Sequence, residues 1–405
     1  MSKYLLQCFC SRRSGCSSAR HARDTIARLT LLLCALAMGM GQTTLLGAMP
    51  LLMSHSGLAL TEVTISFAIG SALFLVGAPL WSFVGSRWGS KLVVGQALAG
   101  FVVSHTVLLW QLYAGPALDH QDLWLLGGRA LYGLSCAALI PTAQAWLCEL
   151  DTTNSRLASV SRIAAAMTLG RFLGPALGAI STAWSTLGPF WIVTLVGWPP
   201  VIGLIACKPP PEAAKPMSSL SSNSGSIRVW PLLLVATLTQ FTLGSVHYGI
   251  GPWLGTTLQL NDIDASIHLS WLLSGTTLVM LFTQVCVLPR CRPERWLLSW
   301  ASGLLMLAGS LMALANSAAE VWAGVLMTGV CCATLGPIYT ALLSTRTAAR
   351  HNTHGTSAVS VCHTLGFGLS GLAVGWVMPL GPSMVFVGVA ASGLFMLLLT
   401  WLDHS

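Results

Sequence analysis

The sequence predicts an all-α membrane protein whose twelve transmembrane helices form two six-helix bundles related by pseudo-symmetry. Three observations predict this fold class. The 405 residues are 54% hydrophobic and only 8% charged, whereas charged residues make up about 25% of a soluble domain. The apolar residues gather in twelve segments of about 20 residues, the length that crosses the hydrocarbon core of a bilayer. The two halves of the chain also repeat short stretches of each other.

The first half of the chain holds six of these apolar segments. They follow a basic stretch, residues 1–28, which we expect to be a cytoplasmic tail. Residues 29–206 are expected to form the N-terminal bundle. Its segments lie near residues 29–53, 62–84, 92–112, 123–147, 159–182 and 188–206.

The second half holds the other six segments. Residues 207–228, rich in proline and serine, are expected to be a cytoplasmic linker, and residues 229–405 the C-terminal bundle. An offset of 196 residues aligns residues 131–141 with 327–337, and 168–170 with 364–366. Such a repeat is typical of carriers that bind a solute between their halves. The segments lie near residues 229–256, 267–288, 296–315, 320–343, 356–379 and 382–402.

The basic residues predict the orientation of the chain in the membrane. If the N-terminus is cytoplasmic, 18 of the 20 lysines and arginines fall in the tail and the inner loops, and none falls in an outer loop. An excess of lysine and arginine on the cytoplasmic side sets the topology of most membrane proteins. The remaining two, Arg129 and Arg171, lie inside apolar segments. We therefore expect a multi-pass protein of the bacterial inner membrane with both termini in the cytoplasm.

The residue pattern argues against several other classes of protein. The net charge of +8 is scattered between apolar segments rather than gathered in a patch, so we expect no nucleic-acid partner. Most of the 12 cysteines lie inside apolar segments, without the spacing of a zinc site or a disulfide framework. No nucleophile, metal cluster or phosphate loop stands out. We expect no enzymatic activity, no cofactor and no metal, and a monomer embedded in the lipid bilayer.

Residues 170–179 read GRFLGPALGA. On a helix, Gly170, Gly174 and Gly178 share one face, which lets a second helix approach closely. Pro175 removes a backbone donor and bends the segment. The pattern G-x-x-x-G-P-x-x-G-[GA] resembles the antiporter signature in helix 5 of drug:proton exporters of the major facilitator superfamily. The resemblance implies export, with these glycines in the seam where two bundles move; alternatively, they only pack one helix closely on another.

A second stretch resembles the inner-loop motif of the same superfamily, G-x-x-x-D-[RK]-x-G-[RK]-[RK]. Residues 82–91 read SFVGSRWGSK and match it at Arg87, Gly89 and Lys91, but a serine replaces the aspartate. A charged lock on the cytoplasmic gate would then need another carboxylate, and Glu149 and Asp151 are the candidates. Alternatively, the two basic residues only determine topology.

A third stretch, residues 129–137, fits the superfamily pattern R-x-x-x-G-x-x-x-A in helix 4. The resemblance implies that Arg129 takes part in proton coupling. Alternatively, the side chain of Arg129 extends towards the outer surface, because long cationic side chains near a helix end reach for water.

Arg171 is the strongest candidate for a functional side chain. At 1.5 Å per residue it lies about 18 Å past the inner end of its helix, near the midplane of the membrane. A lone arginine there faces a cavity, pairs with a carboxylate or binds an anion, and no Asp or Glu lies well inside any segment. Alternatively, Arg171 donates to backbone carbonyls that Pro175 leaves free.

Several other polar side chains are expected to line a cavity. His105, His247 and His363 are candidate proton carriers because histidine titrates near neutral pH; alternatively, they only hydrogen-bond between helices. The candidate residues for substrate binding or coupling are Arg129, Arg171, Tyr132, Gln42, Gln240, His247, Tyr339 and His363.

These features predict a secondary transporter that exports a small molecule by alternating access, with protons as the coupling ion. The family resemblance implies a drug-like substrate, whereas the two arginines indicate an anionic metabolite such as a siderophore. An importer of organic anions and a non-transporting membrane sensor of the same fold remain alternatives.

Overall fold

The computed structural model describes residues 2–151, 156–207, 229–291, 295–346 and 352–402, and this part of the chain is helical without strands. Short 3₁₀ turns follow α4, α11 and α14, and a π-helical turn ends α11. The helices are α1 (Ser2–Gly47), α2 (Met49–Ser56), α3 (Leu60–Trp88), α4 (Ser90–Ala114), α5 (Gln121–Cys136), α6 (Leu139–Leu150), α7 (Arg156–Thr182), α8 (Gly188–Val196), α9 (Trp198–Ala206), α10 (Trp230–Thr257), α11 (Asp262–Phe282), α12 (Arg295–Ala313), α13 (Ala318–Arg346), α14 (Asn352–Val377) and α15 (Pro382–Leu402).

Eleven helical segments of the described chain are long and apolar enough to cross a membrane. The twelfth predicted span, α10, has 28 residues, which is about 42 Å of helix and more than a hydrocarbon core requires. It is less apolar than the others because it carries Gln240, His247 and several threonines. α10 packs among α13, α14 and α15, and its Thr239 and Thr242 are buried. The predicted all-α architecture of two bundles is confirmed.

Three of the predicted spans are each made of two helices. The breaks fall between α1 and α2, α5 and α6, and α8 and α9. Each break precedes a proline, namely Pro50, Pro141 and Pro199, which cannot donate the hydrogen bond that would continue the helix. Pro337, which aligns with Pro141 in the internal repeat, lies inside the unbroken α13, so the repeat does not extend to this break.

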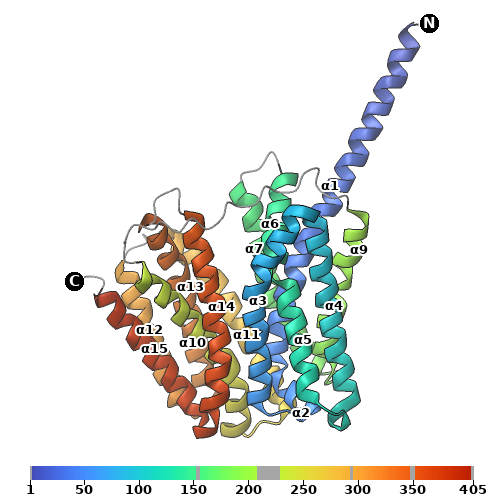
Figure 1. The fold of residues 1–405 in the computed structure, drawn as a ribbon. Helices are drawn as coiled ribbons and strands as arrows, with labels where there is room; N and C mark the ends of the chain where they lie inside the picture. The colour runs from blue at the N-terminus through green and yellow to red at the C-terminus, as the bar shows by residue number, and fades with distance from the viewer. Residues whose placement is uncertain (1, 152–155, 208–228, 292–294, 347–351, 403–405) are drawn as a thin grey trace.

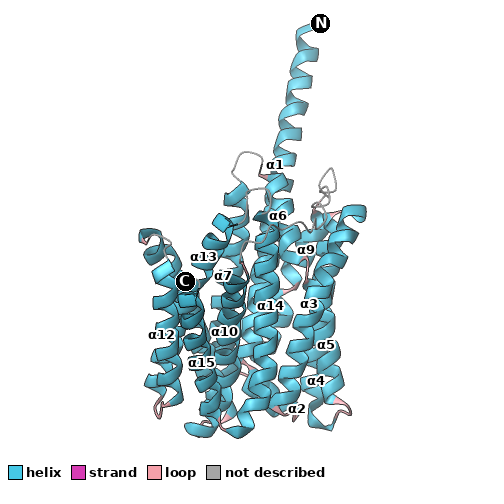
Figure 2. Ribbon diagram, turned by 60° about the vertical axis from the view of Figure 1, so that its left-hand side comes forward, coloured by secondary structure: helices cyan, strands magenta, loops and turns pink. Residues whose placement is uncertain are grey.

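The helices form two bundles that lie side by side, α1–α9 in one and α10–α15 in the other (Figure 1). The N-terminal part of α1 projects far beyond the bundles on one side, here called the tail side; α2 lies on the opposite, far side. α1 is continuous from Ser2 into the first span. The predicted linker, residues 207–228, falls almost entirely outside the described residues. A view turned by 60° shows the same helical bundles (Figure 2).

Glycines bring one pair of helices in each bundle into backbone contact. A Cβ atom on Gly170 of α7 would lie 2.2 Å from the backbone oxygen of Leu36 of α1. In the other bundle, a Cβ atom on Gly366 of α14 would lie 2.2 Å from the backbone oxygen of Thr237 of α10. Because these glycines occupy equivalent positions of the repeat, the pairs α1–α7 and α10–α14 pack in the same way.

The glycines of residues 170–179 do not lie in the seam between the bundles. Gly170, Gly174 and Gly178 all face α1, within the N-terminal bundle. The expectation that they form the moving seam is therefore wrong. The physical reason is that a glycine face marks where two helices touch most closely, and here that contact lies inside one bundle.

The seam is made instead by α3 against α14 and by α7 against α11. Gly371 and Gly375 of α14 lie against Thr64 and Thr61 of α3. The bundles approach each other on the far side and diverge towards the tail side (Figure 1). Among the described residues, hydroxyl groups of one bundle donate to backbone carbonyls of the other: Thr61 Oγ1 to Gly375 O at 3.2 Å, Ser266 Oγ to Gly47 O at 2.9 Å and Ser274 Oγ to Phe172 O at 3.0 Å.

A buried carboxylate joins three helices at the tail side of the N-terminal bundle. Asp151, only 4% exposed, lies 2.8 Å from Arg28 Nε of α1 and 2.8 Å from Arg162 Nη1 of α7. Arg28 Nη2 also donates to the backbone oxygen of Leu150 at 3.1 Å. These ion pairs hold α1, α6 and α7 together.

The loop between α3 and α4 is a tight turn at Gly89, whose φ of 85° favours glycine. Its two basic residues do not pair with the expected carboxylates. Arg87 lies over the ring of Phe83 at 4.3 Å, and Lys91 donates to the backbone oxygen of Cys207. Asp151 is occupied by the two arginines described above and Glu149 is exposed. The predicted lock between this loop and Glu149 or Asp151 is therefore absent from the described residues.

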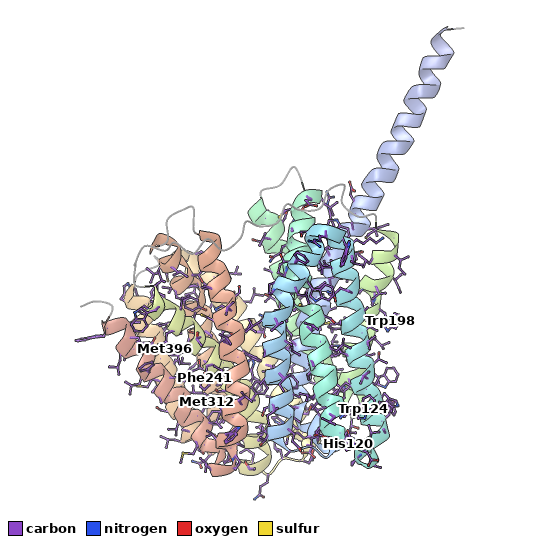
Figure 3. The ribbon with its side chains drawn as sticks, in the orientation of Figure 1. His120, Trp124, Trp198, Phe241, Met312 and Met396 are labelled. Atoms are coloured by element: carbon purple, nitrogen blue, oxygen red, sulfur yellow. The ribbon has the colours of Figure 1, made fainter. Side chains whose placement is uncertain are left out.

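Aromatic side chains cover much of the outer surface. Trp124 and Trp198 stand on the outside of the N-terminal bundle, whereas Phe241, Met312 and Met396 lie in the C-terminal bundle (Figure 3). Met312 and Met396 are fully buried. Trp124 is close to a helix end, as an interfacial tryptophan should be, but Trp198 lies in the middle of the α8–α9 span. Such exposed rings suit contact with lipid.

Replacing Gly170 with alanine tests the contact between α1 and α7. The added Cβ would clash with a backbone oxygen, so we expect the variant to lose about 1–3 kcal/mol of stability. The apparent Tm of the detergent-solubilised protein should fall by several degrees. Gly388→Ala in α15 is the matched control, because its Cβ would meet nothing within 4 Å. Equal Tm values for both variants would contradict the packing described here.

Replacing Asp151 with asparagine tests the ion pairs at the tail side. The variant leaves two arginines without their buried partner, and we expect a loss of about 1–3 kcal/mol because both arginines are partly exposed. Thermal unfolding measures this loss as a lower apparent Tm. Glu149→Gln, an exposed carboxylate two residues away, should leave Tm unchanged. A stable Asp151→Asn variant would show that the ion pairs contribute little.

Candidate functional site

Arg171 of α7 faces the space between the two bundles. Its side chain is exposed, and Nη2 donates to Gln42 Oε1 of α1 at 3.3 Å. Its positive charge acts on Tyr132 of α5, on His247 of α10 and on His363 of α14. A side chain close enough to influence both bundles does not face lipid. Arg171 therefore lies, exposed, on the side of α7 that faces the C-terminal bundle.

Pro175 leaves the backbone carbonyl of Arg171 without its usual helical donor. The partner of this carbonyl is the side chain of Thr43 and not the guanidinium of Arg171. A residue at position 175 would normally donate its N–H to the carbonyl of Arg171, four residues earlier. In the structure the hydroxyl of Thr43 on α1 lies 3.2 Å from that carbonyl oxygen and is bonded to it. The guanidinium of Arg171 is thus not needed to compensate for the proline, and this alternative explanation of the arginine is wrong.

Arg129 of α5 is buried, with only 5% of its surface exposed. Its guanidinium carbon lies 4.9 Å from the centre of the Phe67 ring and 5.3 Å from that of Tyr132. Nη2 has no hydrogen-bond partner among the described residues. The side chain does not reach the outer surface, so the snorkelling alternative is wrong. Cation–π contacts stabilise the charge only in part, by about 2 kcal/mol when desolvated.

The backbone of α5 is fixed beside this arginine. A Cβ atom on Gly133 would lie only 2.0 Å from the backbone oxygen of Gly70 on α3. This contact holds α5 directly against α3, which carries Phe67. The glycine of the R-x-x-x-G pattern therefore has a packing role: it sets the position of Arg129, one turn earlier, against the rings.

A chain of aromatic rings connects the two bundles at this level. The ring of Phe67 in α3 meets Tyr248 of α10 edge-on, with 6.0 Å between centroids. Tyr248 in turn lies 5.5 Å from Phe367 of α14, and Phe367 lies 6.3 Å from His247. Phe67 and Phe367 were not among the residues singled out from the sequence, since nothing in an apolar segment tells which phenylalanine faces the other bundle.

The remaining candidates divide between the bundles. Tyr339 of α13 and His363 of α14 share a hydrogen bond between the hydroxyl and Nε2. His105 lies within the N-terminal bundle, where Nδ1 is bonded to the backbone oxygen of Phe101 at 2.7 Å. Gln240 is half-buried on α10. Among these candidates, Gln42 is hydrogen-bonded to Arg171 and Tyr339 to His363, whereas His105 faces the interior of its own bundle.

The site is rich in donors and positive charge. The described acidic residues lie at or near the ends of the membrane-spanning segments or in loops. On the far side, Glu62, Asp122, Asp262, Asp264 and Glu320 lie in first helical turns. Arg129 Nη2 and His247 Nδ1 are buried and find no hydrogen-bond partner in the part of the chain that the structure describes. No group of three His, Cys, Asp or Glu suited to a metal occurs in the described part of the chain. Such a set of side chains can accommodate an acceptor with negative charge.

The chain is similar to known transport proteins. A model of the Major Facilitator Superfamily matches residues 31–289, more than half of the chain. The triacylglyceride transporter of Mycobacteroides abscessus is 26% identical over 151 residues, which cover 35% of this chain and only 27% of that protein.

Solved structures of transporters have a similar fold. The nucleoside transporter NupG shares 11% identity at a TM-score of 0.74, over 93% of this chain and 99% of that chain. A bacterial homologue of the human lysosomal transporter Spinster, in an inward-facing and occupied conformation, shares 14% identity at a TM-score of 0.69, over 94% of this chain and 96% of that chain. At these identities the likeness concerns the fold alone.

Replacing Arg129 with methionine tests whether the charge of Arg129 contributes to the stability of the fold. Removing a buried, unpaired charge from a ring-lined site should leave the stability unchanged or increase it, by up to about 4 kcal/mol. We therefore expect the apparent Tm of Arg129→Met to equal or exceed that of the wild type. Arg290→Met, at an exposed arginine, controls for the loss of an arginine. A Tm several degrees lower for Arg129→Met alone would contradict this description of the site.

Proposed function

The chain belongs to the major facilitator superfamily, and from this premise we propose that it carries an organic anion across the membrane by alternating access between its two bundles. The chain is a multi-pass transporter and not an enzyme. To this we add a proposed class of substrate, a proposed binding site and a proposed direction of transport.

Arg171 is the observation that carries the proposed substrate class. It is exposed between the bundles and hydrogen-bonded to a neutral amide, Gln42, while the described acidic residues lie elsewhere. An arginine in this position is costly unless a negative group neutralises it, and guanidinium binds carboxylate and phosphate in a bidentate manner. Arg129 is too buried to be the first contact, and it would add to the positive potential around Tyr132.

The arrangement of the bundles supports alternating access. The hydroxyl-to-carbonyl bonds between the bundles lie from the far side to the middle of the helices, whereas the tail side diverges (Figure 1). The excess of basic residues assigns the tail side to the cytoplasm. With this assignment, in a bacterial inner membrane, the conformation is open to the cytoplasm and closed to the outside. Movement of the bundles about the site would expose it to the other face.

Export is the proposed direction. The stretch of residues 170–179 favours it by its resemblance to exporters, although its glycines pack within one bundle. An independent physical argument is that a negative cell interior drives an anion outward, by about 2.3 kcal/mol per charge for each 100 mV. Exchange for protons, which the resemblance also implies, requires that proton and substrate compete for the carrier.

Four other functions can be distinguished by experiment. A drug-like cation would be repelled by Arg171, and an importer of the same anion would show net uptake. A membrane sensor would bind without flux. A neutral lipid is the second candidate substrate, because the similar mycobacterial proteins are named triacylglyceride transporters; transport of a lipid without charge should not depend on Arg171.

Flux in proteoliposomes tests the proposal. The full chain would be tested with benzoate, benzene-1,3,5-tricarboxylate and taurocholate, an amphipathic sulfonate, beside a cationic dye and triolein. We expect flux of at least one anion, at least tenfold lower in Arg171→Gln and partly retained in Arg171→Lys. Arg290→Gln is the matched control and should behave as wild type. Transport of only the cation or triolein, insensitive to Arg171, would refute the anion proposal.

A further inference from the structure

Arg129 lies close behind the contact that closes the far side. α5 begins at Gln121 on the far side, next to His120 (Figure 3). Arg129 follows eight residues after Gln121, which is about 12 Å along the helix. Phe67 follows seven residues after Leu60, where α3 begins. The guanidinium and the ring beside it are therefore at one level, about two turns of helix inside the far end.

Phe67 touches both Arg129 and the other bundle. The centre of its ring lies 4.9 Å from the guanidinium carbon and 6.0 Å from the centre of the Tyr248 ring of α10, which it meets edge-on. Tyr248 is 1% exposed, and a Cβ atom on Gly371 of α14 would lie 3.3 Å from its ring. Tyr248 is thus packed within the C-terminal bundle, and this bundle reaches Arg129 through Phe67.

The seam between this level and the far end is tightly closed. A Cβ atom on Gly375 of α14 would lie 2.5 Å from Thr64 Oγ1 and 3.2 Å from Thr61 Cα of α3. Thr61 Oγ1 also donates to the backbone oxygen of Gly375 at 3.2 Å. These contacts stand between the far side and Arg129, so closure of the seam and burial of the charge go together.

The buried charge is compensated only in part. Nη2 of Arg129 finds no hydrogen-bond partner among the described residues, and the described carboxylates lie at or near the ends of the spans or in loops. The rings of Phe67 and Tyr132 face the guanidinium, but ring faces replace only part of the hydration that a buried cation loses. The closed conformation therefore carries an electrostatic cost that a hydrated Arg129 would not have.

We propose that the charge of Arg129 favours the conformation open to the far side and opposes the closed one, and that Phe67 is the positioning residue that keeps the charge beneath the seam. When the bundles separate, Tyr248 leaves Phe67 and water reaches the guanidinium. The hydroxyl-to-carbonyl bonds and glycine contacts of the seam act in the opposite direction. The charge thus brings the two conformations closer in free energy, so that a ligand with a modest preference for one of them shifts the carrier.

The inference rests on the proposed alternating access and not on the proposed anion, so the test uses the full chain without substrate. Ser266→Cys is the reporter in all variants, because Ser266 is 1% exposed and lies in the seam against Gly47 of α1. A thiol there meets N-ethylmaleimide and water only while the far side is open. Labelling of residue 266 in lipid nanodiscs, followed by mass spectrometry, therefore measures the open population.

The variants separate charge from packing. Arg129→Met should lower the labelling rate of the reporter chain by about tenfold, because the closed conformation loses its electrostatic cost. Arg129→Lys, which keeps the charge, should stay within about threefold of the reporter chain. Arg290→Met, at an exposed arginine, should equal it. Phe67→Leu should raise the rate, and less so in combination with Arg129→Met, because the two side chains are in contact.

An unchanged or faster rate in Arg129→Met would overturn the inference, and so would a lysine variant as slow as the methionine variant. Arg129→Gln, also uncharged, replaces Arg129→Met if the latter does not fold. No labelling of the reporter chain at all would contradict both the inference and the proposed alternating access. A reporter chain that is labelled as expected, but whose parent moves no anion in proteoliposomes, would refute the substrate class alone.

Discussion

The structure depends on one electrostatic constraint: two arginines lie well inside the membrane-spanning segments, and the described carboxylates lie at or near the ends of those segments or in loops. Charges in this position are tolerated only when something neutralises or solvates them. Arg129 is surrounded by rings and lacks a full set of hydrogen bonds, whereas Arg171 opens onto the space between the bundles. The chain therefore keeps one positive charge buried and leaves the other exposed. We regard this division of roles as the basis of substrate selection.

Close packing of glycines keeps these charges in place. Gly133 against Gly70 holds α5 on α3, and Gly170 against Leu36 holds α7 on α1. Thr43 completes the second contact by donating to the carbonyl that Pro175 leaves free. Each arginine is thus carried by a helix that is locked within its own bundle. The bundles themselves meet through hydroxyl-to-carbonyl bonds and aromatic rings, which can separate without leaving a buried ion unpaired.

Most of the fold could be predicted from the sequence, because hydropathy and the distribution of basic residues respond to the bilayer and not to tertiary detail. The helix breaks at Pro50, Pro141 and Pro199 follow from proline chemistry but were not anticipated. Which face a side chain occupies could not be read from one apolar segment. For that reason the glycines of residues 170–179 were expected between the two bundles, although they pack within one of them. The ion pairs of Asp151 and the contacts of Phe67 and Phe367 were not predicted for the same reason. Arg171 was identified because a charged residue in the middle of an apolar segment is unusual, whichever way its side chain points.

The most direct test of the central claim is an experimental structure of the full chain with benzene-1,3,5-tricarboxylate or taurocholate bound. The account predicts density for an acidic group of the ligand within hydrogen-bond distance of the Arg171 guanidinium, about 3 Å, between the two bundles. A ligand bound elsewhere, or an Arg171 side chain paired with a carboxylate of the protein, would contradict it.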